Sequence, residues 1–141
     1  MFKFQTITTK ETYNIRHRVL WPDEPIEYCM MTEDDTAHHF GGYIDQKLVC
    51  VASLFPDGEM KVRLRKFAIL PHMQKKGLGS KMLKEIQTFL SETKISTLWC
   101  DAREAALPFY IKNGFLPYDD VFYKNGIPYQ KAEYKVLPEA P

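Results

Sequence analysis

The sequence predicts an α/β (α+β) fold in which one mixed sheet carries helices on its faces. Runs that alternate apolar and polar residues are typical of half-buried strands, and they are separated by segments with apolar residues at helical spacing. Turn signals at Pro56-Asp57-Gly58 and Asn125-Gly126 divide the later strands. The resulting order is β-α-β-β-β-α-β-α-β-β, which favours a single sheet with helices packed on it.

The first half of the chain is expected to hold a strand, a helix and a hairpin. Residues 2–8 alternate like a strand, and Thr9 is expected to cap a helix over 10–20. Ile15 and Val19 would share one face of that helix. The segment 22–36 contains six acidic residues and no basic one, so we expect a loop or short helix at the surface. Two strands over 39–44 and 48–55, joined by a turn at 45–47, would follow.

The second half is expected to alternate strands and helices. The predicted elements are a strand over 60–70, an amphipathic helix over 77–92, a strand over 95–100, a helix over 104–113 and two strands over 115–123 and 129–137. Asn113-Gly114 is a good C-cap for the shorter helix. We expect residues 1–137 to form one domain and residues 138–141 a short tail.

The composition excludes several classes of protein. The chain has 141 residues, 19 Lys and Arg against 18 Asp and Glu, and three cysteines. A near-neutral charge argues against a nucleic-acid partner, and no apolar run approaches the roughly 20 residues of a membrane span. The odd, sparse cysteine count and the lack of a signal-peptide pattern favour a cytoplasmic protein. His and Cys lack the spacing of metal ligands, so no metal is expected.

The segment from Val62 to Lys84 carries the chemical signals. Val62 and Leu64 share one face of the predicted strand, whereas Phe67 and Ile69 share the other. A β-bulge near Arg65-Lys66 would explain this change and expose backbone groups to a ligand. The alternative is that Phe67 faces a second packed layer.

The sequence Gln74-Lys75-Lys76-Gly77-Leu78-Gly79 comes next and opens the amphipathic helix. Glycines at a helix start allow close approach to the free N–H groups of the first turn, which suits a phosphate or pyrophosphate. The pattern is neither a Walker loop nor a Rossmann fingerprint, so the expected ligand is a pyrophosphate compound other than an NTP or NAD. The alternative is a glycine-containing turn with solvated lysines. From Lys61 to Lys84 there are eight basic residues and no acidic one, a charge that would serve the proposed phosphate site.

Together these residues resemble the acetyl-CoA motif of the GNAT superfamily of N-acetyltransferases. Downstream, the stretch from Pro108 to Phe115 resembles the second signature of the family, an aromatic–Tyr pair before a closing Gly-Phe. The resemblance covers nearly the whole chain. It implies a mixed, mostly antiparallel central sheet with a splayed, bulged strand and helices on both faces.

The resemblance also implies roles for particular residues. Backbone groups of Phe67, Ala68 and Ile69 would bind the pantetheine arm. The CoA pyrophosphate would be held by the backbone N–H groups of Gln74, Lys75, Lys76, Gly77, Leu78, Gly79 and Ser80. Tyr110 would lie near the CoA sulfur and act as general acid for the departing thiolate, or would merely pack with its hydroxyl hydrogen-bonded. No acyl-enzyme is expected.

Other segments, such as 15–18 and 98–100, resemble the glyphosate N-acetyltransferase branch of the family. That branch holds substrate anions with arginines, and two of these map onto Arg65 and Arg103. A third falls at Trp21, and the branch's catalytic His falls at or next to Tyr129. Trp21 could instead form an apolar or cation-binding wall, and Tyr129 an orienting hydroxyl or weak base. The alternative for both arginines is a solvated surface charge.

The expected function is therefore transfer of acetyl from acetyl-CoA to a small amine, with a carboxylate-bearing amine as one option. We expect a monomer or homodimer with no nucleic-acid or membrane partner. One alternative is a CoA-binding module without catalysis. Another is an acetyltransferase of peptides or proteins, because the acidic segment could attract a cationic peptide.

Overall fold

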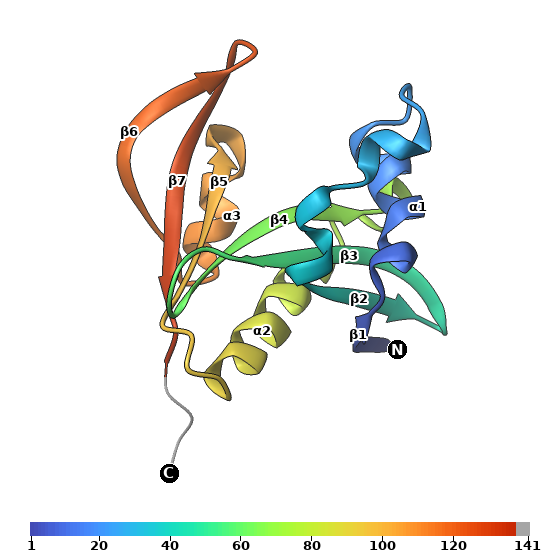
Figure 1. Cartoon of the computed structure of the whole chain (residues 1–141), viewed down its shortest axis with the longest axis horizontal. Coiled ribbons are helices and arrows are strands. Elements are labelled where there is room, and N and C mark those ends of the chain that lie inside the picture. The colour runs from blue at the N-terminus through green and yellow to red at the C-terminus, as the bar shows by residue number, and fades with distance from the viewer. Residues whose placement is uncertain (138–141) are drawn as a thin grey trace. The chain divides into compact units, whose positions relative to one another are not determined.

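The computed structural model describes residues 1–137 and confirms the predicted order of the major elements (Figure 1). The strands are β1 (Phe2–Ile7), β2 (His38–Ile44), β3 (Lys47–Pro56), β4 (Lys61–Ile69), β5 (Thr97–Arg103), β6 (Leu116–Lys124) and β7 (Ile127–Lys135). The α-helices are α1 (Thr9–Leu20), α2 (Leu78–Ser91) and α3 (Leu107–Lys112). The short 3-10 helices are η1 (Ile26–Cys29), η2 (Thr32–Thr36), η3 (Pro71–Met73) and η4 (Glu104–Ala106).

The seven strands form a mixed sheet in the order β1-β2-β3-β4-β5-β7-β6. The β1–β2, β2–β3, β5–β7 and β6–β7 pairs are antiparallel, whereas β4 and β5 run parallel. This is the mixed, mostly antiparallel sheet that was expected. The described part of the chain contains no helix that is long and apolar enough to cross a membrane.

The chain divides into two compact units, and β4 and α2 each contribute residues to both. Unit 1 comprises Met1–Pro56 and Leu64–Met82, and unit 2 comprises Asp57–Arg63 and the residues from Leu83 onward. The expected domain boundaries at 1–137 stay a prediction, and the expected tail at 138–141 lies outside the described residues.

In unit 1, α1 packs on β2 and β3, and it carries a buried charged side chain, Arg16. Arg16 is fully buried, and its guanidinium donates to both carboxylate oxygens of Asp34 at 2.9 Å, to the Cys29 carbonyl and to the Ser53 hydroxyl. His39 joins the network through Ser53 Oγ at 2.7 Å and the Asp34 carbonyl at 3.0 Å. We call these four side chains, Arg16, Asp34, Ser53 and His39, the Arg16 network.

The Arg16 network explains the shape of the acidic segment. Burial opposes ionisation of Asp34, but the Arg16 hydrogen bonds, the Met31 N–H and the Arg16 charge outweigh it and lower the Asp34 pKa. The segment is thus tied to the sheet at Asp34, whereas most of its other carboxylates are exposed. The expectation that the whole segment lies at the surface is wrong at Cys29 and Asp34, which are both buried.

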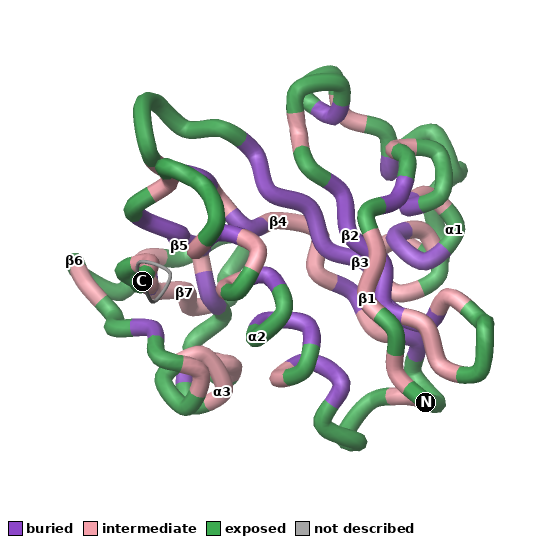
Figure 2. Tube along the Cα trace, turned by 90° about the horizontal axis from the view of Figure 1, so that it is seen from below, coloured by how far each residue is buried: buried purple, intermediate pink, exposed green. Residues whose placement is uncertain are grey.

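In unit 2, β5, β7 and β6 form an antiparallel ladder, and α3 packs on all three strands. Leu98, Cys100 and Ala102 are buried on one face of β5, and Trp99, Asp101 and Arg103 occupy the positions between and after them, where Trp99 is also buried. The tube in Figure 2 shows buried and exposed residues alternating along the turns of α2. Leu83, Ile86 and Leu90 are the buried residues of that helix in this unit.

Two sequence expectations about these elements are wrong. Thr8, not Thr9, caps α1: its hydroxyl accepts from Glu11 N, and the Glu11 carboxylate accepts from Thr8 N at 2.9 Å, a reciprocal capping box. The strand expected over 95–100 instead runs from Thr97 to Arg103, because its charged residues alternate with buried ones rather than ending it.

Candidate functional site

The irregularity predicted in β4 lies at Lys66. Its φ of 56° is left-handed, which is unusual for a residue with a side chain inside a strand. The backbone thus departs from regular pleating where a bulge was expected. The expected switch of the buried face to Phe67 and Ile69 is wrong. Both residues are half-buried, and Ala68 between them is the buried one. The three residues lie within unit 1, as do the residues of the loop that follows.

The loop before α2 presents its backbone at the surface. Gln74, Lys75, Lys76 and Gly77 are exposed, whereas Leu78 and Gly79 are buried and Ser80 is half-buried. Lys75 and Gly77 have φ values of 62° and 80°, and a Cβ at Gly77 would meet nothing within 4 Å. The helix begins at Leu78, so the first N–H groups of its opening turn have no partner within the helix. The arrangement can accept an anion at this end of α2.

Trp21 and Arg65 also lie in unit 1. The Lys66 ammonium stands 4.3 Å from the Trp21 ring centre, and Tyr28 contacts the edge of that ring. Arg65 lies over the Phe55 ring, and its guanidinium is 3.7 Å from a Glu33 carboxylate oxygen. The Trp21 ring therefore contacts a cation of the chain itself, and Arg65 interacts with an acidic side chain of the same unit. The expected roles of Trp21 and Arg65 toward a substrate stay predictions.

Tyr110 lies in unit 2, on α3, against the buried side of β5. Its hydroxyl forms a hydrogen bond with the Cys100 thiol, and its ring contacts Phe115 and Phe109. Burial, followed by the neighbouring Cys100, raises the pKa of Tyr110. The phenol therefore keeps its proton through the neutral range, and the same shift makes it a weaker acid than an ordinary tyrosine.

The cysteines are poor nucleophiles in this structure. All three are buried, and burial raises the pKa of Cys50 and of Cys100 to about 12. Burial also raises the pKa of Cys29. Because the thiolate is the reactive form, these raised pKa values disfavour a cysteine nucleophile at neutral pH. Direct transfer without an acyl-enzyme stays a prediction.

Arg103 and Tyr129 come together in unit 2 as directly opposed residues of β5 and β7. Arg103 is exposed. The half-buried Tyr129 ring stacks on the Phe122 ring, with 5.9 Å between the ring centres. Arg103 and Cys100 are an odd number of residues apart on β5, so their side chains point to opposite faces. Arg103 and Tyr129 thus lie on the other face of the ladder from Tyr110. His38 and His39 stand at the start of β2, and His39 bonds within the Arg16 network.

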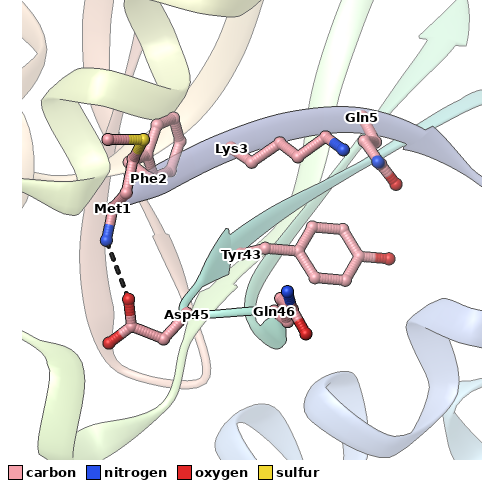
Figure 3. Close-up of a pocket in the computed structure, with 7 residues that line it drawn as sticks. All are labelled: Met1, Phe2, Lys3, Gln5, Tyr43, Asp45 and Gln46. Atoms are coloured by element: carbon pink, nitrogen blue, oxygen red, sulfur yellow. Dashed lines mark hydrogen bonds and ion pairs between the residues drawn. The ribbon is translucent and has the colours of Figure 1, made fainter.

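A pocket of about 550 Å³ lies at β1 and the turn after β2, and the predicted site residues are not among those that line it (Figure 3). It is lined by Met1, Phe2, Lys3, Gln5, Tyr43, Asp45 and Gln46. The Met1 ammonium and the Asp45 carboxylate form an ion pair of 2.9 Å at its edge. Both groups are strongly exposed, so the pair adds little rigidity.

Sequence reasoning missed a group of charged residues around Asp101. The Asp101 carboxylate accepts from Arg63 Nη2 at 2.7 Å and from the ammonium groups of Lys124 and Lys131 at 3.0 Å each. We call Asp101, Arg63, Lys124 and Lys131 the Asp101 cluster. The alternation of Trp99, Asp101 and Arg103 along β5 indicated that these side chains share one face of the strand. It could not indicate the partners of Asp101, because they come from three other strands. No group of three His, Cys, Asp or Glu side chains in residues 1–137 is placed to hold a metal ion.

Comparison with known proteins identifies the family. Residues 9–136 match the model of the acetyltransferase (GNAT) domain. The chain is 32% identical to an uncharacterized N-acetyltransferase, YitI, of Bacillus subtilis over 97% of both chains.

Solved structures share the fold at low sequence identity. The ribosomal-protein-S18-alanine N-acetyltransferase of Escherichia coli has a TM-score of 0.80 and 18% identity, covering 100% of this chain and 97% of its own. A GNAT family acetyltransferase of Elizabethkingia anophelis with acetyl-CoA bound has a TM-score of 0.75 and 14% identity, covering 95% and 97%. The domain match and the relative from Bacillus subtilis place this chain in the GNAT family of N-acetyltransferases.

Proposed function

We propose that this enzyme transfers the acetyl group of acetyl-CoA to the amine of a small molecule that bears a carboxylate. The amine nitrogen would attack the thioester carbonyl directly, forming the C–N bond as the C–S bond breaks. The departing sulfur would take its proton from Tyr110, and the proton that the amine loses would pass through water and restore the Tyr110 hydroxyl. Catalysis would come mainly from positioning the amine and polarising the carbonyl.

The observation that carries the proposal is the exposed stretch from Gln74 to Gly77, which leads into the start of α2. Left-handed Lys75 and Gly77 turn this stretch outward, and Lys75 and Lys76 add positive charge. A pyrophosphate fits such a helix start. The fold neighbour from Elizabethkingia anophelis contains acetyl-CoA, which supports the choice of this cofactor.

Two matched glycines test the cofactor site. Gly77 and Gly58 have φ values of 80° and 84°, and a Cβ on either would meet nothing within 4 Å. Gly77→Ala and Gly58→Ala should therefore cost similar backbone strain, about 1 kcal/mol each. Only Gly77→Ala should raise the KM for acetyl-CoA, measured by thiol release. Equal KM values in the two variants would refute the proposed pyrophosphate site.

Tyr110→Phe tests the general acid. A positioned acid contributes about 10²-fold or more to the rate, so kcat should fall by about that factor. Tyr134→Phe is the control, because Tyr134 packs on Phe115 as Tyr110 does. If both variants keep the wild-type kcat, Tyr110 only packs.

The acceptor end is proposed at Arg103 and Tyr129. A guanidinium donates two parallel hydrogen bonds to a carboxylate, and the neighbouring phenol could orient the amine. A place in the glyphosate N-acetyltransferase branch is part of this proposal, although Trp21 and Tyr129 replace an arginine and the histidine of that branch. A panel of amino acids and their amides would test it, with the acids expected to have the lower KM.

A protein acceptor is the second candidate, favoured by the acidic segment. Asp23, Glu24, Glu27, Glu33 and Asp35 are exposed there and could attract a cationic peptide. The fold neighbour from Escherichia coli acts on a ribosomal protein. Basic peptides acetylated faster than any small amine would favour this candidate, and acetyl-CoA binding with no thiol release for any amine or peptide would indicate a non-catalytic CoA-binding module.

A further inference from the structure

The Asp101 cluster contains more positive charge than its own carboxylate can neutralise. Arg63, Lys124 and Lys131 all reach Asp101, so three cations share one anion. Burial opposes ionisation of Asp101, but hydrogen bonds from Lys124 and Lys131 and the charge of Arg63 outweigh it and lower its pKa. Asp101 is therefore ionised at neutral pH, and two positive charges are still in excess.

Aromatic rings hold these cations in place without neutralising them. Lys131 and Arg63 stand 4.5 Å and 4.8 Å from the centre of the Trp99 ring, and Lys124 stands 4.8 Å from that of Tyr129. Cation–π contacts orient an ammonium or guanidinium but leave its full charge available. The Trp99 indole N–H donates to the Asp57 carboxylate at 2.8 Å, so the ring that contacts Lys131 and Arg63 is fixed.

Donor capacity is also left over. The Arg63 Nε atom is buried and has no hydrogen-bond partner within the described residues. Each lysine ammonium has three donors. The side chains of Arg63, Lys131 and Lys124 are 27%, 33% and 44% exposed, so a ligand can reach them.

We propose that Arg63, Lys124 and Lys131 form a subsite that binds an oxyanion group, a carboxylate or a phosphate, of the acceptor. This inference rests on the proposed acetyltransferase function and defines its substrate class as amines with a strongly acidic group. The subsite is continuous with Arg103 and Tyr129: these two residues are opposed across β5 and β7, and Lys124 lies over the Tyr129 ring. An acceptor could therefore place one acidic group at Arg103 and a second at the Asp101 cluster.

Tryptophan fluorescence tests binding directly, without turnover. The chain has two tryptophans, so the Trp21→Phe variant of the full chain reports on Trp99 alone. We would titrate it with inorganic phosphate and with succinate, using chloride at equal ionic strength as the control. Saturable changes with either oxyanion, absent with chloride, are expected.

A pair of lysine variants on β7 tests whether the fluorescence change comes from oxyanion binding at the Asp101 cluster. Lys131→Met removes a cluster cation and keeps the packing of its stem. Lys135→Met removes a cation that pairs with Glu133 at 3.5 Å instead. Loss of a charged hydrogen bond should weaken oxyanion binding about tenfold in Lys131→Met, whereas Lys135→Met should stay within about twofold. Equal weakening in both variants, or no saturable change in the parent, would overturn the subsite.

Kinetics identify the source of the oxyanion. In Lys131→Met, the KM of a carboxylate-bearing or a phosphate-bearing amine should rise about tenfold. We would infer that the amine class whose KM rises is the class of the acceptor. The KM of a matched amide should not change, and an equal rise for the amide would refute the role in acceptor binding. A Trp99 signal with no thiol release from any amine would overturn the proposed function instead.

Discussion

The Arg16 network and the Asp101 cluster use the same side-chain chemistry for different ends. In the Arg16 network, one cation meets one carboxylate, both are almost fully buried, and Ser53 and the Cys29 carbonyl take up further donors. In the Asp101 cluster, three partly exposed cations share one carboxylate. A balanced, closed set of charges fixes a fold, whereas an unbalanced, open set can receive a ligand. The following variants test this distinction.

The largest loss of stability is expected from Arg16→Met. This change leaves the Asp34 carboxylate buried without its cation, which typically costs about 3–5 kcal/mol. Urea denaturation measures the free energy of unfolding. The double variant Arg16→Met/Asp34→Leu should recover much of the loss, because no unpaired charge is then buried. A loss below about 1 kcal/mol in the single variant would mean that the network does not stabilise unit 1.

Ser53→Ala should have an intermediate effect. Its hydroxyl accepts from Arg16 at 3.0 Å and bonds His39 at 2.7 Å. Removing it leaves buried polar atoms unsatisfied, at about 1–3 kcal/mol. The same denaturation experiment measures it, with Ser91→Ala as the control because the Ser91 hydroxyl bonds only an exposed helical carbonyl. Equal losses in the two variants would contradict the assignment.

Lys131→Met should barely affect stability, in contrast to its effect on oxyanion binding. The cluster retains Arg63 and Lys124 beside Asp101, and partly exposed ion pairs contribute about 0–1 kcal/mol. Thermal unfolding checks this expectation. A loss comparable to that of Arg16→Met would show that the Asp101 cluster is a structural element and would remove the distinction between the two.

Acid should weaken both sets, because Asp34 and Asp101 have lowered pKa values in the folded protein. A group of this kind stabilises the fold above the pKa of the unfolded chain, about 4 for Asp. This stabilisation is lost as the pH falls through the lower pKa of the folded state. Urea denaturation between pH 7 and pH 2 should show a constant free energy of unfolding that declines below about pH 4. Asp101→Asn should reduce that decline, and an unchanged decline would show that Asp101 makes no contribution to it.

Local patterns in the sequence predicted the fold well. The turns at Asp45-Gln46 and Asn125-Gly126 have the left-handed φ values that tight hairpins need. The capping box was readable from Thr8 and Glu11, but the neighbouring Thr9 obscured it. These features depend on a few adjacent residues, so a single sequence contains them.

The candidate site was predicted less completely, because its charges pair over long distances along the chain. Arg16 lies 18 residues from Asp34, and Arg63 lies 38 from Asp101. An arginine on a helix is ordinarily assigned to solvent, and nothing near Arg16 in the sequence marks it as buried. The motif from Gln74 to Ser80 is contiguous, and it could therefore be identified as a ligand-binding segment from the sequence.

The division of β4 and α2 between the units has a consequence for synthesis of the chain on the ribosome. Unit 1 needs Leu64–Met82, and unit 2 needs Asp57–Arg63 as well as the residues after Met82. A nascent chain released up to residue 56 still lacks the strand and helix turn that complete its first unit. No single cut separates the units, so a truncated product would lose part of one or both. The protein is therefore expected to acquire its structure late in translation and to be degraded as a whole when synthesis stops early.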